Sequence, residues 1–190
     1  MKINNLDDLG AFIALSGLVE PDMIKTFDTA VEKLLGDKDR LKKKATILLS
    51  TPGGKIWVGD ALAERIRLLS GFIDLRIIAM TLVASSGVRI FLSLPKERRF
   101  ISPGGVIMIH PCTRDDPTMS SVSYQERERV LREDMLELEF SKGREEQWIR
   151  ALARELGMKY KPTKALWVKS HRFGAKEAVE RGLATSIFRT

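Results

Sequence analysis

The stretch DLRIIAMTLVASSGVRIFLSL, residues 74–94, decides the fold. Its first half is an apolar run typical of a buried strand, and its second half changes to the mixed pattern of a probable helix. Ser85 and Ser86 stand at this change. A polar pair at the end of a buried strand caps a helix, fills hydrogen bonds in a turn, or takes part in catalysis. A serine before a helix is most often a cap. The stretch alone therefore does not establish a catalytic role, and all three readings stay open.

Similar alternations of strand and helix lie on both sides of this stretch. AFIALSG at 11–17 reads as a buried strand, and the periodic segment 21–36 that follows reads as a helix that ends at Gly36. A strand at 47–49, a Pro-Gly-Gly turn and a helix repeat the pattern, and a strand at 104–111 and a short helix and strand at 174–187 complete it. The pattern predicts one α/β domain with buried, partly parallel strands.

The segment 120–156 differs in composition from the rest of the chain, because it is rich in charged residues and has the pattern of a helix throughout. Leu131, Met135 and Leu138 form one apolar stripe, and Ile149, Leu152 and Leu156 form a second. We expect a long helical arm with a break at Gly143. A small domain cannot cover the whole stripe, so the arm predicts a homo-oligomer, with a helix folded back onto its own core as the alternative.

Composition excludes several classes of protein. The chain of 190 residues has one cysteine and two histidines, which disfavours a metal site, and no cofactor is expected. The longest apolar stretch is interrupted by charges, so no membrane span is expected, and the first ten residues do not resemble a secretory signal. We therefore expect a cytoplasmic protein. The net charge of +7 is spread along the chain and alternates with acids, which argues against a nucleic-acid partner.

Three pieces of sequence are candidates for a hydrolytic site. Ser85 precedes the expected helix, where the N–H of Ser86 can help to hold an oxyanion. His110 ends an apolar strand, which is where sites gather in α/β folds, although a lone histidine there is more often structural. The turn TPGG, residues 51–54, can bring backbone N–H groups close to a ligand, but it lacks the spacing of a phosphate-binding loop and equally fits a plain tight turn.

Five segments, taken in order, resemble the proteolytic subunit of the Clp protease, the ClpP family. The resemblance runs from about residue 11 to residue 187 and is weakest in the helical arm. The segments are AFIALSGLVEPDMIKTFDTAVEKLL, LLSTPGGKIWVGDALAERI, VASSGVRIFL, SPGGVIMIHP and AKEAVERGLATSI.

The resemblance implies roles for four residues. Ser85 corresponds to the nucleophile and His110 to the general base. The N–H groups of Gly54 and Ser86 correspond to the oxyanion hole. Proteolysis of peptides or unfolded proteins inside a closed chamber is the implied activity, without a metal or other cofactor.

The resemblance also implies an architecture and partners. It indicates a single ClpP-like domain over residues 1–190, with a crotonase-like fold of repeated β-β-α units. The head would comprise about 11–119 and 160–190, and a protruding helical handle about 120–157. The chain would assemble with itself into heptameric or tetradecameric rings. Further implied partners are an AAA+ ATPase unfoldase or another ClpP-type subunit, with neither nucleic acid nor membrane involved.

The sequence departs from the family at the third catalytic residue, an aspartate that precedes the A-x-E-A helix. Counting back without a gap places Ser170 there, and a gap of one residue places His171 there. Neither is an anion at neutral pH. The nearest acids to His110 in sequence are Asp115 and Asp116. The chain is therefore a weak dyad enzyme, an enzyme with a relocated acid, or a silent relative that serves as a structural or regulatory ring subunit.

Two further observations leave alternatives open. The basic amino-terminal loop of the family is not recognisable before the first strand, which weakens the expectation of an unfoldase partner. Outside the ClpP family, the remaining rivals are a crotonase-fold enzyme acting on acyl-CoA and a signal-peptide-degrading peptidase with a serine and lysine pair.

Overall fold

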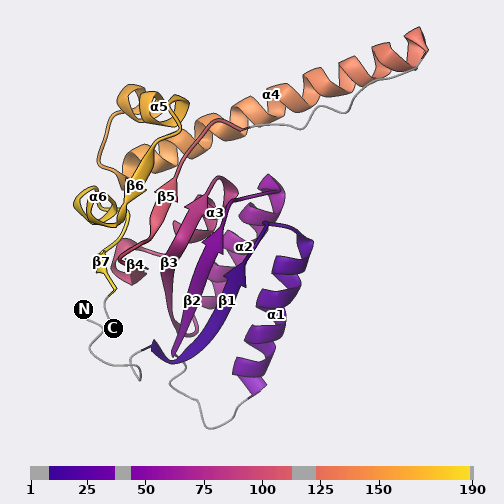
Figure 1. The fold of residues 1–190 in the computed structure, drawn as a ribbon. Coiled ribbons are helices and arrows are strands. Elements are labelled where there is room, and N and C mark those ends of the chain that lie inside the picture. Colours follow the sequence, from indigo (N-terminus) through magenta and orange to yellow (C-terminus); the bar gives the residue numbers. More distant parts are fainter. Residues whose placement is uncertain (1–8, 37–43, 113–122, 189–190) are drawn as a thin grey trace. The chain divides into compact units, whose positions relative to one another are not determined.

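A computed structural model of the chain describes residues 9–36, 44–112 and 123–188. The chain divides into two compact units (Figure 1). The first comprises the residues up to His110 together with those from Ser170 onward, and the second comprises Pro111–Lys169. The first unit contains every strand of the sheet, and the described residues of the second form two helices.

The first unit is built on a seven-stranded sheet. Along the main path the order is β1-β2-β3-β4-β7, and all four neighbouring pairs are parallel. Strand β5 pairs with β3 in parallel and with β6 in antiparallel orientation. The strands are β1 (Ala11–Ser16), β2 (Lys44–Thr51), β3 (Asp74–Ala84), β4 (Arg99–Ile101), β5 (Val106–Met108), β6 (Arg172–Gly174) and β7 (Ser186–Ile187).

Helices follow the strands as the alternating pattern predicts, and the α/β fold class is confirmed. In α1 the buried side chains are Met23, Phe27 and Leu34, which recur at the spacing of one helical face. The centre of the sheet is fully buried, as expected for parallel strands covered on both faces. The helices are α1 (Pro21–Gly36), α2 (Ile56–Leu69), α3 (Ser86–Phe91), the 3-10 helix η2 (Lys96–Arg98) and α6 (Ala175–Glu180).

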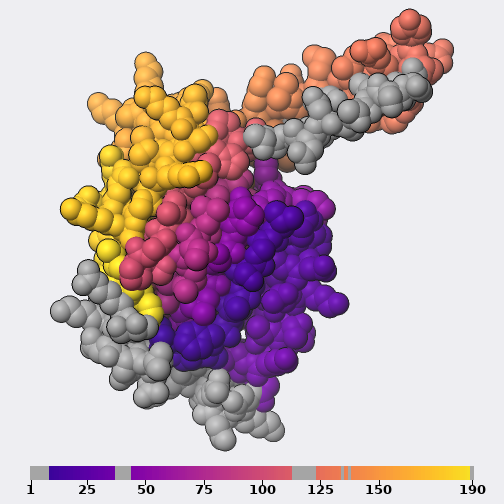
Figure 2. All heavy atoms as spheres, viewed as in Figure 1, coloured from indigo at the N-terminus to yellow at the C-terminus, as the bar shows by residue number. Residues whose placement is uncertain are grey.

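The C-terminal segment completes the sheet beside β4 and β5. Figure 2 shows its yellow atoms against those of this central region, in agreement with the pairing of β7 with β4 and of β6 with β5. Strand β5 ends at Met108, so His110 lies two residues beyond the strand and does not end it as the sequence suggested.

The second unit contains α4 (Tyr124–Glu155) and α5 (Tyr160–Val168). The expected break at Gly143 is wrong, because α4 runs through this residue without interruption. One glycine costs a helix only about 1 kcal/mol relative to alanine, which the rest of a long helix absorbs. Near the C-terminal end of α4, Trp148 packs edge-on against Trp167 of α5, with ring centroids 6.4 Å apart.

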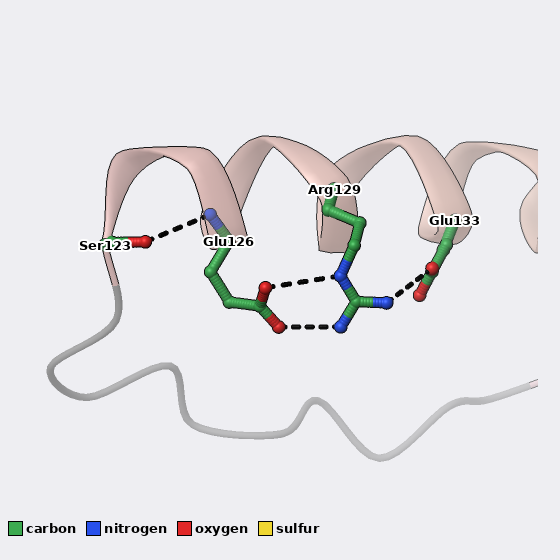
Figure 3. Close-up of polar contacts among 4 residues, drawn as sticks. All are labelled: Ser123, Glu126, Arg129 and Glu133. Carbon is green, nitrogen blue, oxygen red and sulfur yellow. Dashed lines mark hydrogen bonds and ion pairs between the residues drawn. The ribbon is translucent and has the colours of Figure 1, made fainter.

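The first turns of α4 are held by a capping residue and a chain of ion pairs (Figure 3). Ser123 accepts a hydrogen bond from the N–H of Glu126 at 3.2 Å. Arg129 donates to both carboxylate oxygens of Glu126, at 2.6 and 3.2 Å, and to Glu133 at 2.7 Å. These contacts hold the pKa of Glu126 below its usual value, through the hydrogen bond and then the charge of Arg129.

The two apolar stripes of the arm have different surroundings. Ile149 and Leu152 are buried, whereas Leu131, Met135 and Leu138 are all at least half exposed. An exposed stripe of this kind is the feature from which the sequence predicts contacts with another copy.

Candidate active site

Ser85 lies in the turn between β3 and α3 with an unusual backbone conformation. Its φ is +54° and its ψ is −127°, a region that costs a residue with a side chain about 1–3 kcal/mol. Its hydroxyl does not cap α3, and no described residue forms a hydrogen bond with it. The common explanation for a serine before a helix therefore does not apply. A strained strand-to-helix turn that presents a hydroxyl is the arrangement in which other hydrolases hold their nucleophile.

The Pro-Gly-Gly turn after β2 packs directly against Ser85. A Cβ added to Gly53 would come within 2.4 Å of the Ser85 Cβ and 3.1 Å of its Oγ. Gly53 has a φ of +103°, so its conformation also favours glycine. Sequence reasoning assigned a role to Gly54 and missed this contact of Gly53, although the glycine pair was the signal for it.

Gly54 presents its backbone beside this contact. The Gly53 carbonyl accepts from the N–H of Val19 at 2.8 Å, and the Lys55 N–H donates to the Val19 carbonyl at 2.8 Å. The N–H of Gly54, between them, makes no hydrogen bond to a described residue. A Cβ on Gly54 would lie 2.6 Å from the Val19 oxygen, so the close approach needs glycine here too.

Ser86 joins the two segments. It is fully buried, and its hydroxyl donates to the Gly54 carbonyl at 3.2 Å. Its N–H is the first of α3 and has no acceptor within the helix. The structure therefore brings Ser85, Ser86 and Gly54 together, and it gives the Ser86 side chain a structural contact that sequence reasoning did not foresee.

His110 follows a strand that lies beside Ser85. Ala84 of β3 is in register with Met108 of β5, and the Ser85 N–H donates to the Met108 carbonyl at 3.2 Å. Both Ser85 and His110 thus leave the carboxyl ends of adjacent parallel strands, where ligands bind in α/β sheets.

The antiparallel pairing of β5 with β6 relates the His110 segment to Ser170 and His171, the two positions at which an aspartate was expected. Met108 is paired with Arg172, and the next step along the ladder is the hydrogen bond from the Ile109 N–H to the His171 carbonyl at 3.0 Å. Continued by one residue beyond this bond, the same register would align Ser170 with His110, which lie outside both strands. Ser170 has a φ of +54°, a conformation in which aspartate and asparagine are enriched.

His171 belongs to the other face of this pair of strands. Side chains alternate between faces along a strand, and directly opposed residues share a face. His171 therefore shares the face of Ile109, and its ring packs edge-on against Phe173 with centroids 4.5 Å apart. Its Nε2 lies 3.0 Å from Oε1 of Glu177. The ungapped count, which gives Ser170, and the count with a gap, which gives His171, thus fall on residues of opposite faces. Asp115 and Asp116 lie outside the described residues.

The second unit contributes the chain's cysteine, Cys112. Partial burial, and then the charge of Glu145, raise the pKa of this thiol. A thiol with a raised pKa is a poor nucleophile near neutral pH, so Cys112 is unlike an activated catalytic cysteine.

The arrangement around Ser85 suits acyl transfer. It combines a hydroxyl on a strained turn, backbone N–H groups from two segments, and a histidine two residues beyond the end of an adjacent strand. Over the part of the chain that the structure describes, no group of His, Cys, Asp and Glu residues could hold a metal ion. No helix within the described ranges is long and apolar enough to cross a bilayer.

Comparison with known proteins gives a family and a fold. The family model described as Clp protease matches residues 13–190. Among solved structures, an asparagine-to-aspartate mutant of ClpP1 from Listeria monocytogenes superposes with a TM-score of 0.72 and 20% sequence identity, over 94% of this chain and 91% of that chain. At this level of identity the similarity is evidence for the fold alone. No curated protein sequence matches the chain.

Proposed function

Because the chain belongs to the Clp protease family, we propose that it is a serine-type endopeptidase that cleaves peptides or unfolded proteins. The observation that carries the proposal is the strained backbone of Ser85, whose hydroxyl does not cap α3 and against which the Pro-Gly-Gly turn packs. The hydroxyl of a capping serine accepts a hydrogen bond from a backbone N–H of the helix, which stabilises it. Ser85 has the energetic cost of a strained backbone without this hydrogen bond. Strain of this kind gathers at functional sites.

The proposed mechanism uses four residues. His110 removes the proton from the Ser85 hydroxyl, and the oxygen attacks the peptide carbonyl to form a tetrahedral intermediate. The N–H groups of Gly54 and Ser86 donate to the developing oxyanion. His110 then gives its proton to the leaving amine, and water releases the acyl group from Ser85 by the same steps in reverse. Catalytic hydrogen bonds often form only in the complex with substrate, so the serine and histidine need not be bonded beforehand.

We also propose an assembly and a setting. The chain forms heptameric or tetradecameric rings in the cytoplasm as a single ClpP-like domain, with the exposed stripe of α4 covered by another copy. An AAA+ unfoldase or a second ClpP-type subunit is the further partner. The half-exposed Leu131, Met135 and Leu138 support the self-association, because an uncovered stripe of this size favours a partner.

A second candidate function is a catalytically weak or silent ring subunit. Ser170 favours it, because this residue, at the position where the ungapped count expects an aspartate, carries no charge. In the well-studied triads, loss of the aspartate lowers turnover by roughly 10⁴, since it fixes the imidazole tautomer and stabilises the imidazolium. Homo-oligomers that cleave unfolded casein would exclude this candidate, whereas purification with a second ClpP-type chain and silence alone would favour it.

A fluorophosphonate probe tests the proposed nucleophile directly. We expect covalent labelling of the assembled protein at Ser85, identified by peptide mass spectrometry, and none in Ser85→Ala. Ser86→Ala should keep labelling within about tenfold, because it retains the backbone N–H and loses only the hydroxyl contact with Gly54, a hydrogen bond of about 1 kcal/mol. Failure of the wild-type protein to label in every oligomeric state would refute an active enzyme, and equal loss in both variants would refute the assignment of roles.

Ser170→Asp tests whether residue 170 is the position of the third catalytic residue, where an aspartate was expected. We expect it to raise peptide turnover by between about tenfold and 10⁴-fold, because an aspartate opposite His110 would restore the missing anion. The left-handed conformation at this position suits aspartate. His171→Asp is the matched control, since its side chain shares the face of Ile109 and should give no gain. A gain in His171→Asp and none in Ser170→Asp would show that the register argument is wrong.

A further inference from the structure

Glu177 belongs to the A-x-E-A helix, and the proposed mechanism gives it no role. Its Oε1 lies 3.0 Å from Nε2 of His171 and 3.5 Å from Nε of Arg181. The His171 and Glu177 side chains are only 30% and 31% exposed, so the contact is largely withdrawn from water. The pair therefore ties helix α6 to the residue immediately before β6 more firmly than a fully exposed contact would.

His171 is also bonded to the segment that carries His110. Its carbonyl accepts from the N–H of Ile109, the residue immediately before His110. On the opposite side, the Met108 carbonyl accepts from the N–H of Ser85. Strands β5 and β6 are three residues each, and the main-chain hydrogen bonds between these two segments continue as far as Ile109. The hydrogen bond from the Ile109 N–H to the His171 carbonyl is the last of them before His110, the proposed general base.

The turn at Ser170 needs support from its neighbours. A serine with a φ of +54° is strained, and such conformations persist only where the surroundings hold them. His171, the next residue, is held by the Glu177 carboxylate on one side and by the ring of the fully buried Phe173 on the other. These two contacts hold the residue that links the strained turn to the His110 segment.

We propose that Glu177 is a positioning residue, which fixes the placement of the His110 imidazole through its contact with His171. The proposal rests on the proposed function for the role of His110 as base. Glu177 does not touch the reacting atoms. It orients the β6 main chain, and that main chain orients the last residues before His110.

The chain has two histidines, which makes the proposal accessible to NMR. In protein labelled at histidine Cε1, we expect two cross-peaks, assigned with His110→Gln and His171→Gln. Glu177→Ala should shift the His171 cross-peak, because its carboxylate partner is lost, and should also shift or broaden the His110 cross-peak. Glu177→Gln keeps an oxygen that accepts from Nε2 and should return the His110 cross-peak to its wild-type position.

Glu180→Ala is the matched control, because it removes another carboxylate from α6. Its partner is Lys176, at 3.8 Å, and both side chains are mostly exposed. We expect neither histidine cross-peak to move in this variant. A shift of the His171 cross-peak alone in Glu177→Ala, with the His110 cross-peak unchanged, would overturn the proposal. If Glu177→Ala does not fold, His171→Ala provides the same test. It removes the side chain that contacts Glu177 but keeps the residue 171 carbonyl that accepts from Ile109, and the one remaining histidine cross-peak, that of His110, should shift or broaden.

A functional measurement separates this inference from the proposed function. Fluorophosphonate labelling at Ser85 should slow by roughly tenfold in Glu177→Ala, since small displacements of a catalytic group carry large kinetic costs. It should recover in Glu177→Gln and be unchanged in Glu180→Ala. A wild-type protein that never labels would refute the peptidase, while the NMR comparison would still decide whether Glu177 positions His110. Unchanged labelling in Glu177→Ala of a protein that labels would refute the positioning role.

Discussion

Gly53→Ala is the most direct test of the contact between the Pro-Gly-Gly turn and Ser85. The added methyl group would lie 2.4 Å from the Ser85 Cβ and 3.0 Å from the Ala84 carbonyl oxygen. Both neighbours belong to the end of β3 and the turn after it, where the main chain is already strained. The methyl group can be accommodated only if the turn moves away from Ser85.

The size of the effect has two parts. A φ of +103° penalises any residue with a side chain, by about 1–2 kcal/mol. The steric overlap adds about 1–3 kcal/mol, the usual cost of over-packing. For a chain of 190 residues, 1 kcal/mol corresponds to roughly 2–4 °C in Tm. We expect Gly53→Ala to lower Tm by about 4–20 °C.

Gly17→Ala separates the two parts. Gly17 has a φ of +91°, but a Cβ there would meet nothing within 4 Å. This variant should show only the backbone cost, a fall in Tm of about 2–8 °C, and label with the fluorophosphonate at the wild-type rate. Gly53→Ala should also lose labelling at Ser85 by about a hundredfold, because the proposed oxyanion donors and the proposed nucleophile would be displaced from each other. Equal effects of the two variants on Tm and labelling would refute the proposed packing of the turn on Ser85.

Two further predictions concern the second unit. Alkylation of Cys112 by iodoacetamide at pH 8 should be slower than in the urea-unfolded chain, because burial and the Glu145 carboxylate raise the pKa of the thiol. Glu145→Gln should speed this reaction and Glu146→Gln should not; equal rates in folded and unfolded protein would contradict the prediction. At the start of α4, contact with Arg129 lowers the pKa of Glu126 in the folded state. The contact therefore stabilises the helix when the pH is above the pKa that Glu126 has in the unfolded chain, and this stabilisation is lost as the pH falls through the pKa of the folded state. Amide hydrogen exchange in the first turn of α4, corrected for intrinsic rates, should therefore accelerate below about pH 4, and this step should be absent in Glu126→Gln.

The strands, the helices of the first unit and the family were accessible from the sequence because they depend on local patterns. Helix α1 begins and ends where its periodic apolar residues and Gly36 predicted, at Pro21 and Gly36. The apolar runs around Ile47 and Ile77 became buried parallel strands, since no polar alternation marks an exposed face. The order of the five segments identified the family, which the match over residues 13–190 confirms.

Features that depend on pairing between distant segments were not accessible from the sequence. The hydrogen bond between Ile109 and His171 joins segments separated by the whole second unit. Counting along the chain left Ser170 and His171 as alternatives, and only the strand register distinguishes their faces. The continuity of α4 through Gly143 was mispredicted for the opposite reason, because a local propensity was given more weight than the length of the helix.

The pairing of β5 with β6 also sets the order in which the chain can mature during synthesis. Residues up to 110 contain Ser85, both glycines of the turn and His110 itself, but β6 is translated only after the whole of the second unit. A nascent chain therefore carries Ser85, the proposed nucleophile, well before it carries the strand that pairs beside the His110 segment. Because these contacts are distant in sequence, they form late. The pairing of β5 with β6 therefore cannot form until residues 172–174 have been synthesised and are free to fold.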